Sequence, residues 1–180
     1  AHFISVLNNT SNDDFVCEIE SVFNVADYLK ILALDVLIGN WDGYAGNKNN
    51  YYLYHNPMTD LFDYIPYDLD NTWGITWGNF NWESENPYNW ANNMSFGNEF
   101  RPLYDRILAV QEYRNLFSHY LTHITNNWFN HEFVTNYISS RLPLLSESIL
   151  MDEYYPLSYG FTSADYENSL TQAWGEHIKY

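Results

Sequence analysis

The segment "NWDGYAGNKNNYYLYHNPMTDLFDYIPYDLDNTWG", residues 40–74, decides the fold. Its aromatic and aliphatic runs, residues 51–55 and 61–67, flank the short turn segment "NPMTD", and this arrangement predicts a β-hairpin. The preceding residues 40–50 are rich in Asn, Gly and Asp and predict a loop. Pro66 cannot donate a backbone hydrogen bond, so we expect it at an edge or at the end of the second strand.

The sequence on both sides of this segment has a helical pattern. Residues 2–8 predict one or two helical turns, and Asn24 is a good N-cap for a helix that ends at Gly39. Apolar residues recur along that helix at steps of three and four, namely Val25, Leu29, Leu32, Ala33, Val36 and Leu37. Residues 71–100 read as irregular, and four helices are expected after them, starting near Pro102, Val110, Asn130 and Thr162, with a kink at Pro143. With no repeat and no linker, residues 1–180 predict one α+β domain that is mostly helical.

The composition limits the classes of partner. Seven basic against 23 acidic residues give a formal charge of −16, which repels a phosphate backbone and argues against nucleic-acid binding. A hydrophobic fraction of 46% indicates a folded chain, while no apolar run approaches the ~20 residues of a membrane helix. Few charges beside many Asn, Tyr and Trp residues are typical of exported proteins, so we expect an extracytoplasmic location. The single Cys17 rules out an internal disulfide.

Acidic and amide side chains gather around the predicted hairpin. Asp42 lies in the loop before it, with Asn47, Asn49 and Asn50 at the end of that loop, and Asp68 and Asp70 follow the second strand. If the strand continues, Asp68 and Asp70 lie side by side on one face and repel each other unless a cation lies between them. Mg²⁺ prefers such oxygen ligands, yet Asp and Asn are also the commonest turn residues. The residues alone leave both interpretations open.

The same segment resembles the signature of the CotH family, the spore coat protein H kinases. Family members have an Asp-containing loop, an "HNYYLY"-like strand, and a "PWDLD"-like strand end followed by Gly. The corresponding residues here are "NNYYLY", residues 49–54, and "PYDLD", residues 66–70. The helical sequence "RPLYDRILAVQEYRNLF", residues 101–117, also resembles the family pattern, so the likeness covers most of the chain.

The resemblance implies a protein-kinase-like C-terminal lobe whose hairpin carries the catalytic and metal-binding residues. It implies transfer of phosphate from ATP, with Mg²⁺ or Mn²⁺, to Ser or Thr of an exported or coat protein. Asp42 matches the aspartate that orients the substrate hydroxyl and accepts its proton. Asn50 and Asp68 match nucleotide-associated metal ligands, and Asp70 matches a second acid that binds or supports the metal. Asn47 keeps the five-residue spacing from the catalytic aspartate that ordinary kinases use, so either asparagine can be the ligand.

Four departures from the family pattern bear on activity. The stretch from Asp42 to Asn50 is about three residues longer than usual, Tyr67 replaces a Trp, and Asn49 stands where His is common. No strand lysine for the nucleotide phosphates is visible, because Lys30 lies on a helix, Lys48 in the loop and Lys179 near the end. We therefore expect the C-terminal lobe of a longer protein, with little or no transfer activity by itself. The alternative is a secreted binding or scaffolding module on a kinase-like fold.

Other candidate sites are weaker. His119 and His123 lie four apart on a helix, but no third ligand is evident, so exposed or satisfied histidines are expected. Glu83 and Glu85 suggest the paired acids of a glycosidase and rank third. Among the tryptophans of residues 73–90, we expect Trp73 to pack in the core, while the roles of Trp82 and Trp90 stay open.

Overall fold

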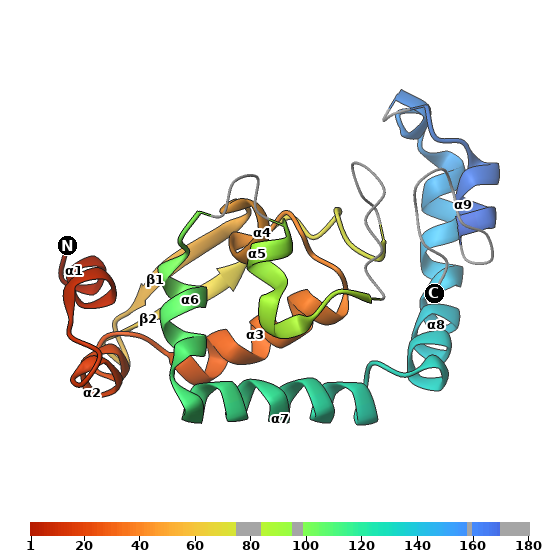
Figure 1. Ribbon diagram of the computed structural model, residues 1–180. Helices are drawn as coiled ribbons and strands as arrows, with labels where there is room; N and C mark the ends of the chain where they lie inside the picture. Colours follow the sequence, from red (N-terminus) through yellow and green to blue (C-terminus); the bar gives the residue numbers. More distant parts are fainter. Residues whose placement is uncertain (75–83, 95–98, 158–159, 170–180) are drawn as a thin grey trace.

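The computed structural model describes residues 1–74, 84–94, 99–157 and 160–169. Figure 1 shows its helices and its hairpin in chain order. The elements are α1 (His2–Asn9), α2 (Phe15–Glu20), α3 (Val25–Leu37), α4 (Tyr44–Asn47), β1 (Tyr51–Asn56), β2 (Leu61–Pro66), η2 (Pro87–Asn89), α5 (Trp90–Met94), α6 (Pro102–Ala109), α7 (Gln111–Asn127), α8 (His131–Met151), η3 (Tyr155–Leu157) and α9 (Ser163–Ser169). The fold class is α+β and mostly helical, as the sequence predicts.

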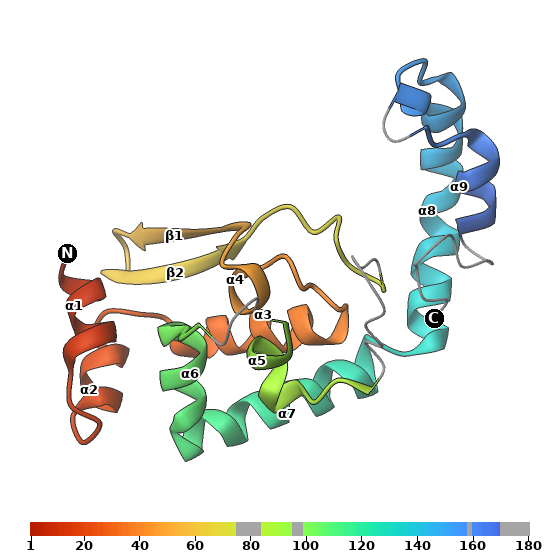
Figure 2. The same cartoon turned by 45° about the horizontal axis from the view of Figure 1, so that its top comes forward.

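The β-hairpin forms where the sequence predicts it. Strands β1 and β2 are antiparallel, and Tyr51 pairs with Pro66 at the open end while Asn56 pairs with Leu61 at the turn. Pro66 is the last residue of β2, as expected for a residue without a backbone donor. Figure 2 shows the hairpin lying over α3, with α7 on the other side of that helix.

Helix α3 is the centre of the core. Asn24 caps it by accepting a hydrogen bond from the Asp27 backbone N–H, and Gly39 follows its end with φ +70°, a conformation that favours glycine. The predicted apolar face is confirmed at Val25, Leu29, Leu32 and Ala33, which are all buried. Side chains from α1, α2, α5, α6, α7 and the hairpin complete one continuous apolar cluster around this helix.

Tyrosine rings fill the space between the hairpin and α3. Tyr51 of β1 and Tyr64 of β2 stack with ring centroids 5.4 Å apart. Tyr28 of α3 meets Tyr64 edge-on at 5.3 Å, and Tyr44 of α4 meets Tyr51 edge-on at 5.1 Å. Such edge-to-face and stacked pairs contribute about 0.5–1.5 kcal/mol each beyond their buried area. They fix the strands and α4 relative to α3.

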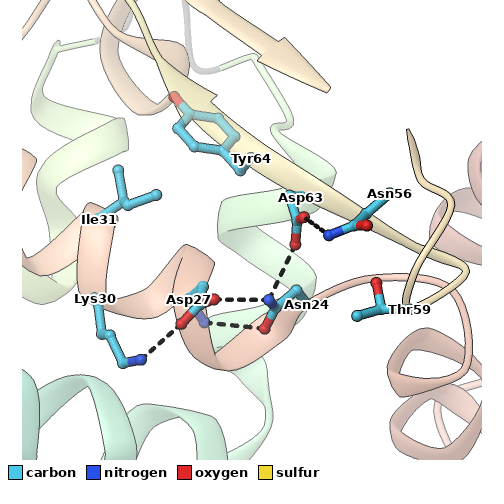
Figure 3. A pocket seen from close by; sticks show the side chains of 8 residues that line it. All are labelled: Asn24, Asp27, Lys30, Ile31, Asn56, Thr59, Asp63 and Tyr64. Atoms are coloured by element: carbon cyan, nitrogen blue, oxygen red, sulfur yellow. Dashed lines mark hydrogen bonds and ion pairs between the residues drawn. The ribbon is translucent and has the colours of Figure 1, made fainter. Parts of the chain in front are cut away.

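A polar network joins the turn end of the hairpin to the start of α3, at the wall of a cleft of about 460 Å³ (Figure 3). The Asn24 Nδ2 atom donates to Asp63 Oδ1 at 3.0 Å and to Asp27 Oδ2 at 2.7 Å. Asn56 donates to the other Asp63 oxygen at 3.0 Å. The backbone N–H of Asn24 also donates to the Phe62 carbonyl at 2.9 Å. Asn24 is therefore both a helix cap and a link to the hairpin.

Replacing Asn24 by alanine is expected to lower the free energy of unfolding by about 1–2 kcal/mol, because the cap and both carboxylate contacts are lost. Urea unfolding followed by circular dichroism measures this. Asn130→Ala is the matched control, since Asn130 caps α8 by accepting from the Phe133 N–H at 2.9 Å but leads into a helix without buried residues. An equal loss in both variants would contradict a linking role for Asn24.

Three local predictions need correction. A helical turn, α4, interrupts the predicted loop 40–50, and α2 was not predicted. Within the stretch predicted to be irregular, residues 87–94 form η2 and α5, while residues 75–83 and 95–98 lie outside the described part. Helix α8 includes Pro143, as the sequence predicts, and the kink expected there stays a prediction; the later part of the predicted last helix lies outside the described residues.

Helices α8 and α9 lie outside the core. Figures 1 and 2 both show them side by side, projecting beyond the end of α7. Ser146 and Tyr166 join them by a hydrogen bond of 3.2 Å between their hydroxyls. No residue of α8 is buried, and Leu144 and Leu145 are exposed. Among the described residues, no helix combines the length and apolar character needed to cross a membrane.

Candidate functional site

The Asp42 carboxylate is the centre of the candidate site. Asn47 donates its amide to Oδ1 at 2.7 Å. Asn50 and Asn71 donate theirs to Oδ2, at 3.0 and 3.1 Å. A carboxylate accepts about four hydrogen bonds, so three fixed amides hold its plane and leave room for one more donor. The predicted convergence of Asp42, Asn47 and Asn50 is present, and Asn71 is a fourth member that sequence reasoning missed.

The local backbone brings these side chains together. Helix α4 begins after Gly43 and ends at Asn47, its C-cap Lys48 has φ +55°, and this single turn places Asn47 beside Asp42. Asn50 also has a left-handed backbone, with φ +53°, and turns the chain into β1. Lys48 and Asn50 thus make two sharp reversals within three residues. Asn adopts this conformation more readily than most residues.

Asp68 and Asp70 lie in a short loop that is tied to the same site at both ends. The Tyr67 N–H donates to the Asn50 carbonyl at 2.9 Å, and the Asn71 amide contacts Asp42. Thr72 closes the loop with a hydrogen bond of 2.9 Å from its hydroxyl to the Leu69 carbonyl. Both aspartates are exposed at the rim of the site.

Asp68 and Asp70 do not lie on a continued strand, so the condition for placing them side by side on one face is not met. Strand β2 ends at Pro66, and Asp68 has φ +53°, so the rule that residues i and i+2 share a face of a strand does not apply. Within the described residues no group of three or more His, Cys, Asp or Glu side chains is placed to hold a metal ion. The described residues therefore form no metal site that consists of acidic side chains alone.

The donors present fit Mg²⁺ in a different way. Mg²⁺ is usually held by one or two carboxylates together with water and substrate phosphates, rather than by a complete protein cage. Asp68 and Asp70 supply exposed carboxylates. The Asn47 and Asn50 amides turn their nitrogen atoms toward Asp42, so their oxygen atoms face elsewhere. Carboxylate and amide oxygens are the kind of ligand that a hard cation takes.

A buried arginine supports the loop from the opposite side. Arg101, at the start of α6, is 3% exposed. Its guanidinium donates to the Gly46 carbonyl of α4 and to the Glu99 carbonyl, the latter at 2.7 Å. Lys48, at the end of α4, forms an ion pair with Glu99. The sequence did not point to Arg101, because an arginine before a helix is ordinarily exposed.

A buried carboxyl lies beneath the same loop. Asp35 of α3 is 5% exposed, and burial raises its pKa to about 6, against the opposing effect of a hydrogen bond from the Asn40 amide at 3.0 Å. An acid with a higher pKa in the folded protein holds its proton more tightly there. Its contribution to stability is therefore present at low pH and is lost as the pH rises from the usual 3.8 through about 6.

Asp35→Asn is expected to remove that pH dependence. The difference in pKa corresponds to about 3 kcal/mol of unfolding free energy, which the wild type loses between about pH 4 and 6 and the variant does not. Urea unfolding at a series of pH values measures the difference between the two proteins. Asp13→Asn, in an exposed turn, is the control and is expected to follow the wild type. Parallel curves for wild type and Asp35→Asn would contradict the prediction.

The structure gives different results for the other candidate residues of the sequence analysis. The expectation for Trp73 is wrong, because its side chain is 40% exposed and its ring stacks on Phe129 at 5.3 Å. Trp90 is buried, and Trp82 and Glu83 lie outside the described residues. His119 and His123 are exposed on α7, as expected, with stacked rings 5.9 Å apart.

Comparison with known proteins agrees with the resemblance seen in the sequence. The family model described as CotH kinase protein matches residues 1–177. The chain belongs to this family. A curated relative, the inner spore coat protein H of Bacillus subtilis (strain 168), is 28% identical over 148 residues, which cover 82% of this chain and 38% of the relative. The chain thus corresponds to well under half the length of that relative.

Proposed function

We propose that this chain carries the catalytic loop and metal-binding segment of a kinase-like phosphotransferase. The observation that carries the proposal is the Asp42 carboxylate, held by three amides, one of which comes from Asn71 at the end of the loop that carries the exposed Asp68 and Asp70. Phosphoryl transfer needs a positioned nucleophile and neutralised charge more than covalent chemistry. The family description and the kinase-like order of Asp42, Asn47 or Asn50, and Asp68 support this reaction over other uses of the site.

In this proposal Asp42 orients a Ser or Thr hydroxyl and accepts its proton. The amides of Asn47 and Asn71 hold the carboxylate in one orientation, which lowers the entropy lost when the hydroxyl binds. Asp68 and Asp70, with an amide oxygen of Asn47 or Asn50, would hold Mg²⁺ or Mn²⁺. When bound, that ion would neutralise charge on the ATP phosphates.

The proposed acceptor is a protein at the cell surface or in a coat. The relative's name places that protein in the inner spore coat, which supports a coat or extracytoplasmic location here. The charge of −16 favours association with basic rather than acidic proteins.

One observation favours a second candidate, a binding module without catalysis. The lysines of the described part are both engaged, Lys30 with Asp27 on α3 and Lys48 with Glu99. Neither is on a strand, where a kinase places the lysine that holds the nucleotide phosphates. In this second candidate the site residues stabilise the fold, and the chain acts through contacts with other proteins.

Nucleotide binding by the complete protein separates the two candidates. ATP with Mg²⁺ or Mn²⁺ should raise the unfolding temperature, and radiolabelled phosphate should appear on an acceptor protein containing Ser and Thr. The same nucleotide with EDTA is the control. No thermal shift and no transfer would reject the phosphotransferase and favour the binding module.

A further inference from the structure

A buried polar pair lies directly below the candidate site. Asn40, 2% exposed, follows the end of α3, and Asp35 is in the last turns of that helix. The Asn40 backbone N–H donates to the Asp35 carbonyl at 2.8 Å, and its side-chain amide donates to Asp35 Oδ1 at 3.0 Å. Two bonds between the same two residues fix the direction in which the chain leaves the helix.

Stability alone does not account for this pair. Burial disfavours the ionised Asp35 carboxylate, as its raised pKa indicates. The Asn40 Oδ1 atom and the nearby buried Tyr28 hydroxyl have no hydrogen-bond partner within the described part of the chain. Unsatisfied buried polar atoms destabilise a fold, and apolar residues of similar volume are often as stable or more stable. The contacts that the pair makes therefore matter beyond its effect on stability.

The pair contacts the backbone of the catalytic-type loop. A methyl group added at Gly43 would lie 2.9 Å from Asn40 Nδ2 and 3.5 Å from Asp35 Oδ2, so the Gly43 backbone rests on these two side chains. Gly43 directly follows Asp42. It is also the N-cap of α4, and its carbonyl accepts a hydrogen bond of 2.9 Å from Asn47 N–H.

We infer that Asp35 and Asn40 are positioning residues for Asp42: their buried side chains support Gly43 and so set where the Asp42 carboxylate and the Asn47 amide lie. The inference rests on the proposed role of Asp42 in phosphate transfer. Asp35 and Asn40 do not touch the substrate. They act through the backbone that carries the reacting group.

The test compares three variants of the complete protein. Asp35→Ala removes the acceptor of the Asn40 amide, Asp35→Asn keeps an oxygen in the same place, and Val25→Ala removes buried volume at the far end of the same helix. Steady-state transfer of phosphate from ATP to a Ser-containing acceptor gives kcat and KM. Hydrogen–deuterium exchange of the peptide covering residues 41–48 reports on the loop without requiring activity.

Asp35→Ala is expected to lower kcat at least ~10-fold with the KM for ATP within about twofold, and to speed exchange in residues 41–48. Asp35→Asn should recover most of kcat, and Val25→Ala should leave both loop exchange and kcat close to wild type. Unchanged kcat in Asp35→Ala, no recovery in Asp35→Asn, or an equal fall in Val25→Ala would overturn the inference. If the wild type transfers no phosphate, the proposed function has failed; loop exchange then decides whether the pair supports the loop, and unchanged exchange in Asp35→Ala overturns that as well.

Discussion

Replacing Asp42 by asparagine is expected to lower phosphate transfer by the complete protein by about 10²–10⁴-fold, with little change in the KM for ATP. The carboxylate is the group that we assign to orienting the acceptor hydroxyl and taking its proton. Asparagine has the same shape but cannot accept that proton. Its own NH₂ group would also face at least one of the three amides that now donate to Asp42.

The fold should survive this change, because Asp42 is only half-buried and water can reach the amides that lose their partner. Radiolabelled ATP transfer gives the rate, and circular dichroism with urea unfolding checks the fold. Asp13→Asn, in an exposed turn remote in sequence from the site, is the matched control and should keep full activity. Transfer at the wild-type rate by the Asp42 variant would refute the assigned role.

Gly46→Ala is expected to give the largest loss of stability, more than ~3 kcal/mol. A methyl group at this position would lie 1.8 Å from the Trp41 carbonyl oxygen and 2.7 Å from its carbonyl carbon. Both are backbone atoms, so no side chain can rotate away to make room. The loop would have to open, and the Gly46 carbonyl would then lose the bond from the buried Arg101 guanidinium.

Two other glycines supply a graded series for this prediction. At Gly43 the nearest atom to an added methyl group is the Asn40 side-chain amide at 2.9 Å, a longer contact than at Gly46 and not with the backbone, so a smaller loss is expected. At Gly160 nothing lies within 4 Å, and only the backbone cost of φ +76°, about 1 kcal/mol, applies. Urea unfolding of the three variants measures the order. A Gly46→Ala variant as stable as Gly43→Ala would contradict the close contact with Trp41.

The sequence predicted those parts of the fold that local patterns control. Helix α3 combines an N-cap at Asn24, regular apolar spacing and Gly39 at its end, and all three features act within one element. The hairpin likewise follows from two runs of strand-forming residues around a short turn. Helix α4 has four residues, too few to show a periodic pattern. Helix α8 has an apolar pattern but contributes nothing buried, because what an apolar helix packs against is a long-range property.

The candidate site likewise contains residues that the local sequence predicted and residues that only long-range contacts bring in. Asp42, Asn47 and Asn50 lie within one loop, so their convergence followed from their spacing. Asn71 donates to Asp42 across 29 positions of sequence, and Arg101 donates to Gly46 across 55. Asn and Arg are common surface residues, and neither carries a local signal of such a contact. Trp73 shows the converse error, because aromatic character suggested burial whereas its positive φ, +58°, belongs to a tight turn at the surface.

The left-handed backbone at Asn50 and Asp68 means that substitution experiments must separate two demands at each position. Asn, Asp and Gly tolerate this conformation better than alanine does. Alanine at position 68 would therefore remove a carboxylate and also disfavour the turn that displays it. Glycine removes the carboxylate but keeps the turn, and asparagine keeps the turn and one oxygen. The same restriction applies to natural variation at these positions. Asp and Asn both tolerate the left-handed backbone and supply oxygen ligands, so their occurrence there does not by itself distinguish a turn from a cation site.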